Sequence, residues 1–463
     1  SKSYHFPLSL FSIEITEFKQ ILQINLKNST KEKVLNSIKE LERLKGVYSA
    51  EPNYFSEPTT VPNDVYYANG SQWNLNGTGG INAEMAWNYS HGNNDIRVGI
   101  IDTGIANHDD LNDNLVSGYD FFNNDTITND DTNGHGTKVA GIIGAQGNNN
   151  EGIAGINWDI TLVPLQASNK KNSFYSSDAI KAIQWAQSKW GTSQQIDIIN
   201  YSVAGFGVST SLLESIKAYE GLFVWAAGND GNNVDSFVDI EKFNLDNLIS
   251  VGAIDKNNER SVWGTQSSNY GENVNIFAPG GYGFSNVLPG DNIPTTDNYG
   301  NYSKFSGTSC AAPHVTGVAA LILSVNPNLS AGQLKNILLD NSDNINITVP
   351  NSLGGTSLQT VKKLNAYKAV KSVHRHTYKY FDFKGKHTGV CECGDSYTEG
   401  HQVSAASTGR YVTCIVCGAT VDTNKYPVII VPFYDSVSQL STESTVISTK
   451  YQLQEYLNGA RTV

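Results

Sequence analysis

The middle of the chain alternates between short apolar runs and segments in which apolar residues recur every three or four positions. Short runs of this kind are typical of buried strands, and the longer periodic segments are typical of helices with one face in the core. We therefore expect strands at 98–104, 160–165, 196–202 and 222–227. Helices are expected at 177–189, from 309 through the apolar run 318–323, at 333–339 and at 365–373, with a polar loop at 341–355.

The first 57 residues form a predicted unit of their own. Apolar positions within 11–26 alternate well enough for a strand or a hairpin. A helix is expected next, because Ser29 and Glu32 have the spacing of a capping box and Gly46 ends the helical pattern. A short strand at 47–50 then leads into an exposed linker at 55–61, which is rich in Ser, Glu, Pro and Thr.

Histidines and cysteines gather in 374–425, which we expect to be a small β-rich module. Its cysteines form two pairs, Cys391 with Cys393 and Cys414 with Cys417. Two such pairs can bind zinc tetrahedrally, but they can also oxidise to two disulfides or stay free thiols. Residues 426–463 are expected to be a tail of unknown role, with a strand at 428–431 and a short helix at 451–457.

Composition and charge narrow the possible functions. A chain of 463 residues exceeds what one hydrophobic core normally supports, so two or three domains are expected, and 39% hydrophobic residues suffice for folded cores. The net charge of −12 argues against nucleic acid or an anionic membrane surface as the main partner. No run approaches about 18 apolar residues, so we expect no transmembrane segment.

A serine lies where one of the helices is expected to begin. Ser309 follows Gly307 and Thr308 and precedes the apolar run at 318–323. The free N–H groups and the positive dipole end of a first helical turn stabilise negative charge that develops on a substrate oxygen beside a nucleophile. Taken alone, however, a serine at a helix start is usually a structural cap.

An acid and a base occupy comparable positions. Asp102 ends a predicted strand, at the sheet edge where α/β folds bind ligands, and His135 stands between glycines at the start of another small-residue helix. The segments DTG at 102–104, GHGT at 134–137 and GTSCAAPH at 307–314 together resemble the three signature segments of the subtilisin family of serine proteases. The resemblance covers residues 60–370.

This resemblance implies a three-layer α/β/α domain with a mainly parallel sheet at 58–373, beside a small α+β unit and the β-rich module. It implies an endopeptidase that forms an acyl-enzyme, with Asp102, His135 and Ser309 as the triad. Asn229, in the segment AAGN, would donate one hydrogen bond to the oxyanion and the backbone of Ser309 a second. The edge that binds the substrate would be Ser202, Val203, Ala204 and Gly205.

The resemblance also indicates how such an enzyme is made. The unit at 1–57 is similar to the second half of a subtilase propeptide, which acts as a folding chaperone and as an inhibitor. We expect a secreted zymogen that cuts itself between Phe55 and Pro62. Its expected partners are protein or peptide substrates and its own propeptide, and we expect a monomer, with attachment to the cell surface as an alternative location.

Calcium is the expected structural cofactor. The loop 146–155 is rich in Asn and Gly, and such a loop can supply several of the about six to eight oxygen ligands that calcium prefers. A plain polar turn is the alternative. By position in the family, the ligands would be the side chains of Asp64, Asp110 and Asn149 and the backbone oxygens of Gln146, Glu151 and Ile153.

Two other functions stay open. The chain could be a pseudoenzyme that binds peptides without cutting them, or a surface-attached processing protease whose C-terminal module binds a partner. All three triad residue types and Asn229 are present, which favours an active protease.

Overall fold

The computed structural model describes residues 61–168, 174–203, 209–237, 245–283, 291–351 and 353–375, and outside these the residues 37 and 40 and the backbone of strands within 11–26 and 378–447. The chain divides into two compact units, Ser1–Pro58 and Thr59–Val463. The division lies one residue from the expected one.

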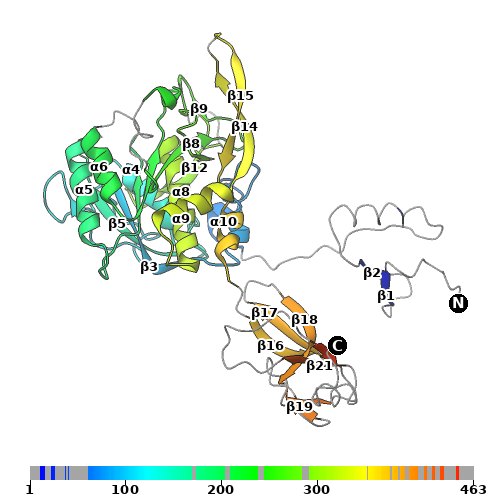
Figure 1. The fold of residues 1–463 in the computed structure, drawn as a ribbon. Coiled ribbons are helices and arrows are strands. Elements are labelled where there is room, and N and C mark those ends of the chain that lie inside the picture. Colours follow the sequence, from blue (N-terminus) through cyan, green and yellow to red (C-terminus); the bar gives the residue numbers. More distant parts are fainter. Residues whose placement is uncertain are drawn as a thin grey trace. The chain divides into compact units, whose positions relative to one another are not determined.

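A nine-stranded sheet runs through the larger unit (Figure 1). All strands from β11 to β4 in the spatial order pair in parallel, and an antiparallel hairpin adds to one edge. The four predicted strands are confirmed as β3, β5, β6 and β7. In spatial order the strands are β14 (Asp343–Pro350), β15 (Thr356–Lys363), β11 (Ile276–Pro279), β8 (Leu248–Ile254), β7 (Leu222–Ala226), β6 (Ile198–Tyr201), β3 (Gly92–Asp102), β5 (Asp159–Gln166) and β4 (Tyr119–Asp120).

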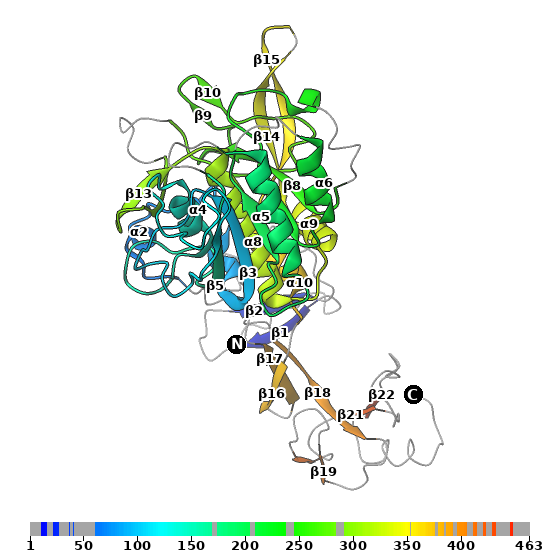
Figure 2. The same cartoon turned by 90° about the vertical axis from the view of Figure 1, so that its left-hand side faces the viewer.

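Helices cover both faces of the sheet (Figure 2). Side chains of β7 alternate between two cores: Val224 and Ala226 pack with α4, α8, α9 and α10, while Phe223 and Trp225 pack with α5 and α6. This arrangement confirms the predicted three-layer α/β/α fold. The helices are α4 (His135–Gly144), α5 (Ser176–Ser188), α6 (Thr210–Ala218), α8 (Thr308–Val325), α9 (Ala331–Asp340) and α10 (Ala366–Val373).

Shorter elements complete the domain. The pair β12 and β13 is an antiparallel hairpin that leads into α8, so it carries the chain towards Ser309. The bounds are α2 (Val65–Ala68), α3 (Ala83–Ala86), η1 (Val234–Phe237), β9 (Val262–Trp263), β10 (Gln266–Ser267), β12 (Ile293–Thr296) and β13 (Tyr302–Phe305).

Helix α8 is the longest element of the core. Most of its side chains are buried, and it packs against α4 and the central strands. It is long and apolar enough to cross a membrane, but 89% of that segment is buried inside the protein. A helix with this burial belongs to the core of a folded domain.

The two helices predicted near the end of the domain, at 333–339 and 365–373, are confirmed as α9 and α10. Ser330 and Gln333 form a capping box at the start of α9, and the side chain of Asn365 accepts a hydrogen bond from the backbone of Lys368 at the start of α10. The prediction of a polar loop at 341–355 is wrong. Apolar and polar residues alternate there, and the segment forms β14, which pairs with β15 in a hairpin that extends from the domain (Figures 1 and 2).

The remaining strands form separate sheets. In the first unit, β1 (Phe11–Ile15) and β2 (Leu22–Leu26) form the predicted hairpin. The expected helix at 29–46 is described at Ser37 and Glu40 alone, and both residues are helical. The strand at 47–50 lies outside the described residues.

The C-terminal module is β-rich, as predicted. Strand β21, which the sequence assigned to a separate tail, pairs in parallel with β18 and so belongs to the sheet of the module. The helix expected at 451–457 lies outside the described residues. The strands are β16 (Tyr378–Phe383), β17 (Lys386–Cys391), β18 (Ser396–Ser404), β19 (Tyr411–Thr413), β20 (Thr420–Asp422), β21 (Val428–Val431) and β22 (Thr445–Ile447).

Candidate active site

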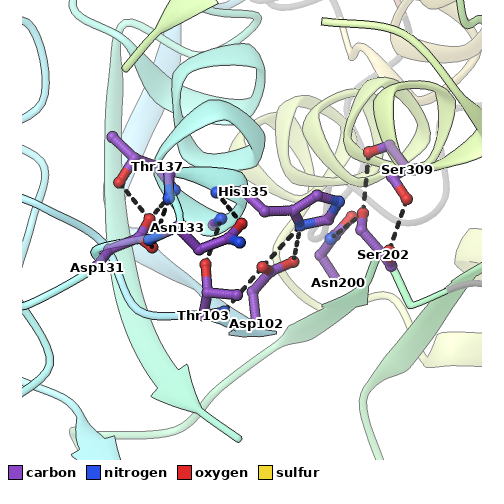
Figure 3. A network of polar contacts seen from close by, with 11 residues as sticks. Asp102, Thr103, Asp131, Asn133, His135, Thr137, Asn200, Ser202 and Ser309 are labelled. Carbon is purple, nitrogen blue, oxygen red and sulfur yellow. Dashed lines mark hydrogen bonds and ion pairs between the residues drawn. The ribbon is translucent and has the colours of Figure 1, made fainter. Parts of the chain in front are cut away.

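Asp102 and His135 are hydrogen-bonded to each other. Asp102 is the last residue of β3 and is fully buried, and His135 is the first residue of α4. The ring nitrogen Nδ1 of His135 lies 2.7 Å from Oδ1 and 2.9 Å from Oδ2 of Asp102 (Figure 3). Because a carboxylate can only accept, Nδ1 carries the proton, and the lone pair of a neutral ring is left on Nε2.

The first turn of α4 is held by polar side chains, which fixes where His135 points. Asp131 is buried, and its carboxylate accepts hydrogen bonds from the backbone of Gly134 at 2.7 Å and of Thr137 at 3.1 Å. It also accepts one from the Thr137 hydroxyl at 2.7 Å. Thr103 accepts from the backbone of Gly136 at 2.9 Å. The N–H groups that a helix start leaves unpaired are thus satisfied.

Ser309 is the second residue of α8 and is buried. Its hydroxyl donates to the backbone carbonyl of Ser202, just after β6, at 2.7 Å. The hydroxyl of Ser202 donates in turn to the backbone carbonyl of Ser309 at 3.1 Å. Within α8 that carbonyl would normally accept from the residue four positions later, which is Pro313 and has no N–H. Ser202 therefore supplies the donor that the proline removes.

A chain of buried side chains continues from Ser202. The amide of Asn200 donates to the Ser202 hydroxyl at 2.9 Å, and Asn200 accepts from the hydroxyl of Thr316 at 2.9 Å. Asn200 lies in β6 and Thr316 in α8, and neither side chain is exposed. Figure 3 shows the far edge of the His135 ring directed towards Ser202 and Ser309. The end of β6 is thus tied to the helix that carries Ser309.

Asn229 lies beside the start of the helix that carries Ser309. The side-chain oxygen of Asn229 accepts from the backbone and from the hydroxyl of Thr308, each at 2.9 Å, which leaves its amide nitrogen pointing elsewhere. A methyl group added at Gly307 would lie 3.7 Å from both the nitrogen and the oxygen of the Asn229 side chain and 3.7 Å from the backbone nitrogen of Ser309, so Asn229 and the first turn of α8 are neighbours. Gly307 has a φ of +112°, a backbone conformation that favours glycine.

The electrostatics of His135 suit a base that must hold a proton during a reaction. Burial alone would lower the pKa of His135, but the charge of Asp102 and its hydrogen bond outweigh burial and raise the pKa above its usual value. Phe305 packs against the ring edge-on, with 5.3 Å between ring centroids. The arrangement can take a proton from a hydroxyl, keep it beside a buried carboxylate, and return it to a leaving group.

Neighbouring groups that resemble catalytic residues have other partners. His314 is fully buried; its Nδ1 lies 2.8 Å from the carbonyl of Cys310 and its Nε2 lies 2.9 Å from the amide nitrogen of Asn74. Burial lowers the pKa of His314 to about 4, so the ring is neutral at pH 7. Cys310 is also fully buried, and burial raises the pKa of its thiol. His314 therefore joins the Asn74 segment to α8.

The predicted substrate edge is described in part. Ser202 and Val203 follow β6 and lie beside the Ser309 helix, whereas Ala204 and Gly205 lie outside the described residues. The carbonyl of Val203 accepts a hydrogen bond from the indole of Trp225 at 3.0 Å.

The predicted calcium ligands lie around two buried carboxylates. Asp64 and Asp110 are 0% and 1% exposed, and loop 146–155 closes over them: the backbone of Asn148 donates to Asp64 at 2.7 Å, and the backbone of Ile153 donates to Asp110 at 3.2 Å. The atom Oδ1 of Asp64 is buried without a hydrogen-bond partner among the described residues. Asn149 donates to Asp110 at 2.9 Å.

Charge at this site is unfavourable without a cation. Burial raises the pKa of Asp64, and burial with a contribution from the charge of Asp64 raises the pKa of Asp110 to about 6. The described residues contain no group of three or more His, Cys, Asp or Glu side chains that could hold a metal. A cation here would therefore depend on amide and carbonyl oxygens as well as the two acids, which is the donor set that calcium accepts.

Of the four predicted zinc ligands, Cys391 is the last residue of β17, and its backbone pairs with Tyr378. Cys393, Cys414 and Cys417 lie outside the described residues. The zinc site therefore stays a prediction.

Several residues of the site were not predicted from the sequence. Asp131 has a weak signal, an acid two positions before the Asn-Gly that precedes His135. Thr308 orients Asn229, and Thr316 bonds to Asn200, which in turn orients Ser202. The first two contacts join residues 79 and 116 positions apart, so they follow from the packing of α8 against β6 and β7. A single sequence carries no pattern for them.

Comparison with known proteins agrees with this geometry. Residues 93–367 match the model of the subtilase family. Subtilisin DY of Bacillus licheniformis is 36% identical over 54% of this chain and 84% of its own length, and an extracellular protease of Xanthomonas campestris is 32% identical over 64% of this chain and 55% of its own.

A solved structure gives the same result. The structure of a protease from Pseudoalteromonas arctica is 29% identical, with a TM-score of 0.55, and covers 68% of this chain and 100% of its own length. The sheet order, the hydrogen bond between Asp102 and His135 and these relatives agree. The chain therefore belongs to the subtilase family and is a serine endopeptidase.

Proposed function

We propose that Asp102, His135 and Ser309 hydrolyse peptide bonds through an acyl-enzyme. The observation that carries the proposal is the bond of 2.7 Å from Nδ1 of His135 to Asp102, because it leaves Nε2 free to accept a proton on the side of Ser309. The hydroxyl of Ser309 would leave the Ser202 carbonyl, turn towards His135 and attack the carbonyl carbon of the substrate.

Each proton has a place in this reaction. His135 takes the hydroxyl proton of Ser309 as the new C–O bond forms, and the oxyanion accepts from the amide of Asn229 and the backbone of Ser309. His135 then gives the proton to the leaving amine as the C–N bond breaks. Water enters, gives a proton to His135 and attacks the acyl group, and the carboxylic acid leaves as Ser309 regains its proton.

Covalent labelling tests this assignment. A fluorophosphonate should label the protein at Ser309, and Ser309→Ala should abolish both the label and the hydrolysis of peptides. Ser306→Ala, a hydroxyl three positions earlier in the chain, is the matched control and should label normally. An unlabelled wild-type protein that still binds peptides would instead support the pseudoenzyme.

We also propose that the first unit is a propeptide and that the mature enzyme is secreted. The support is the predicted linker at 55–61, the division of the chain after Pro58, and the name of the extracellular protease from Xanthomonas campestris. Sequencing of active protein should find a new N-terminus between Phe55 and Pro62. Active protein that keeps Ser1 would contradict self-cleavage, and its presence in cells but not in medium would contradict secretion.

Calcium is the cofactor that we propose for the Asp64 and Asp110 site. The unpartnered oxygen of Asp64 and the raised pKa of Asp110 support a cation there. Asp64, Asp110 and Asn149 would supply side-chain oxygens, and Gln146, Glu151 and Ile153 backbone oxygens. Bound calcium would hold loop 146–155 against the N-terminal segment, which stabilises the fold and leaves the chemistry to the triad.

For the C-terminal module we keep zinc as the proposed ligand of Cys391, Cys393, Cys414 and Cys417. Because β21 pairs with β18, a fragment that ends at residue 425 would cut the sheet, so the full chain is the right sample. One zinc per chain, with four thiols that react after chelation, would support the site. If the protein contains no zinc and these four cysteines do not react as thiols, they form two disulfides instead.

A further inference from the structure

We infer that Trp225 is a positioning residue that sets the place of the substrate edge; this rests on the proposed function of Ser309. Trp225 lies in β7, one strand away from the segment that it contacts. Its indole nitrogen donates to the carbonyl of Val203 at 3.0 Å. Val203 is the residue after Ser202, whose carbonyl and hydroxyl both contact Ser309.

Two consecutive carbonyls of this segment thus have different partners. The carbonyl of Ser202 faces Ser309 on α8, and that of Val203 is held from β7 by Trp225. An edge that pairs with an extended peptide must present its backbone groups at fixed positions, since main-chain hydrogen bonds supply the affinity. The indole therefore fixes this segment on the side away from the nucleophile.

The donor itself is rigid. Trp225 is 1% exposed, and its ring packs against Tyr201 with 5.5 Å between centroids and against Phe223 with 6.2 Å. Tyr201 is the last residue of β6, so the same ring that bonds Val203 also packs against the strand that leads to it. A tryptophan packed on two sides holds its indole N–H in place, and with it the carbonyl of Val203.

Loss of the indole N–H should lower kcat/KM more for long peptide substrates than for short ones. Trp225→Phe keeps an aromatic ring and removes the N–H. We expect kcat/KM for a tetrapeptide amide to fall about five-fold, as for the loss of one buried hydrogen bond, while that for a minimal acetyl ester changes less than two-fold. A short ester needs Ser309 and the oxyanion donors but little of the edge.

The test includes a control and a second variant. Trp73→Phe makes the same chemical change at an indole whose N–H has no acceptor among the described residues, and it should leave both substrates unchanged. If Trp225→Phe does not fold, benzothienylalanine at position 225 replaces the N–H by sulfur in a ring of the same size. Active-site titration of each variant counts folded enzyme.

Equal losses for the ester and the tetrapeptide would overturn the inference and make Trp225 a packing residue, as would no loss for either. A wild-type protein that shows no titratable serine would instead overturn the proposed function. The two failures are therefore distinguishable.

Discussion

At Asn229 the two ends of one amide have different tasks. Its oxygen is held by the backbone and the hydroxyl of Thr308, so the nitrogen that we assign to the oxyanion cannot turn away. Preorganised donors of this kind need no reorganisation at the moment of reaction.

Asn229→Ala should therefore lower kcat with little effect on KM, because the oxyanion forms only on the way to the intermediate. Loss of one such donor costs about 100- to 1,000-fold in kcat in subtilisin, and we expect the same range here. Steady-state kinetics on a peptide amide measure it. The neighbour Asp230→Ala is the control, and a rise in KM alone would contradict the assignment.

The pH dependence of the reaction follows from His135. The ring must be neutral to accept a proton, so activity is lost as the pH falls through its pKa, which Asp102 raises. The acid limb of kcat/KM should lie above pH 6.5. Asp102→Asn removes the negative charge, so the limb should move to lower pH while kcat falls by about 10⁴-fold. A limb that stays in place would exclude His135 as the titrating base.

Among the elements, α4 depends most on polar contacts at its start. Asp131 accepts three hydrogen bonds from the first turn and the residue before it. These bonds hold the backbone that carries His135. The donors to this buried carboxylate are backbone N–H groups and the hydroxyl of Thr137. The helix start is thus both a structural and a positioning feature.

Asp131→Ala should lower the free energy of unfolding by about 2 kcal/mol, because buried donors lose their acceptor. It should also lower kcat, by less than Asp102→Asn does, since His135 keeps its own carboxylate. Denaturant unfolding and kinetics on the same samples measure both effects. The exposed neighbour Thr132→Ala should change neither, and a stability loss without any loss of kcat would limit Asp131 to a structural role.

Some helices and strands could be predicted from the sequence, and others could not. Strands β5 and β7 and helix α9 carry their own local patterns, and the signature segments indicated Asp102, His135 and Ser309. Strand β14 was missed although its apolar residues alternate with polar ones as in a strand, because Asn is uncommon in strands, and pairing with β15 decided the outcome. The contact of Ser202 with Ser309 joins residues 107 positions apart and depends on tertiary packing.

For the whole molecule, the Asp64 and Asp110 site joins separate segments of the chain. Without a cation, the folded state keeps a proton on Asp110 up to about pH 6, whereas the unfolded chain releases it near pH 3.8. The folded state therefore binds more protons in this window, and its stability falls as the pH rises from 4 to 6, by about 3 kcal/mol at most. Calcium should restore this stability above pH 6.

Calcium at about 1,000 times its Kd should raise the Tm at pH 7 by about 8 °C, and the rise should shrink below pH 6, where protons compete. Thermal unfolding with calcium and with a chelator measures this. Asp110→Asn should abolish the difference, and the exposed neighbour Asp109→Asn should keep it. A rise that is unchanged in Asp110→Asn would place the ion elsewhere.

Helix α8 carries Ser309 through the middle of the core, while Asp102 ends β3 about 200 residues earlier in the chain, a separation that slows the formation of contacts. An unfinished chain can thus hold neither the acid nor the base beside its serine. Peptidase activity should therefore appear only after the sheet and α8 have packed together.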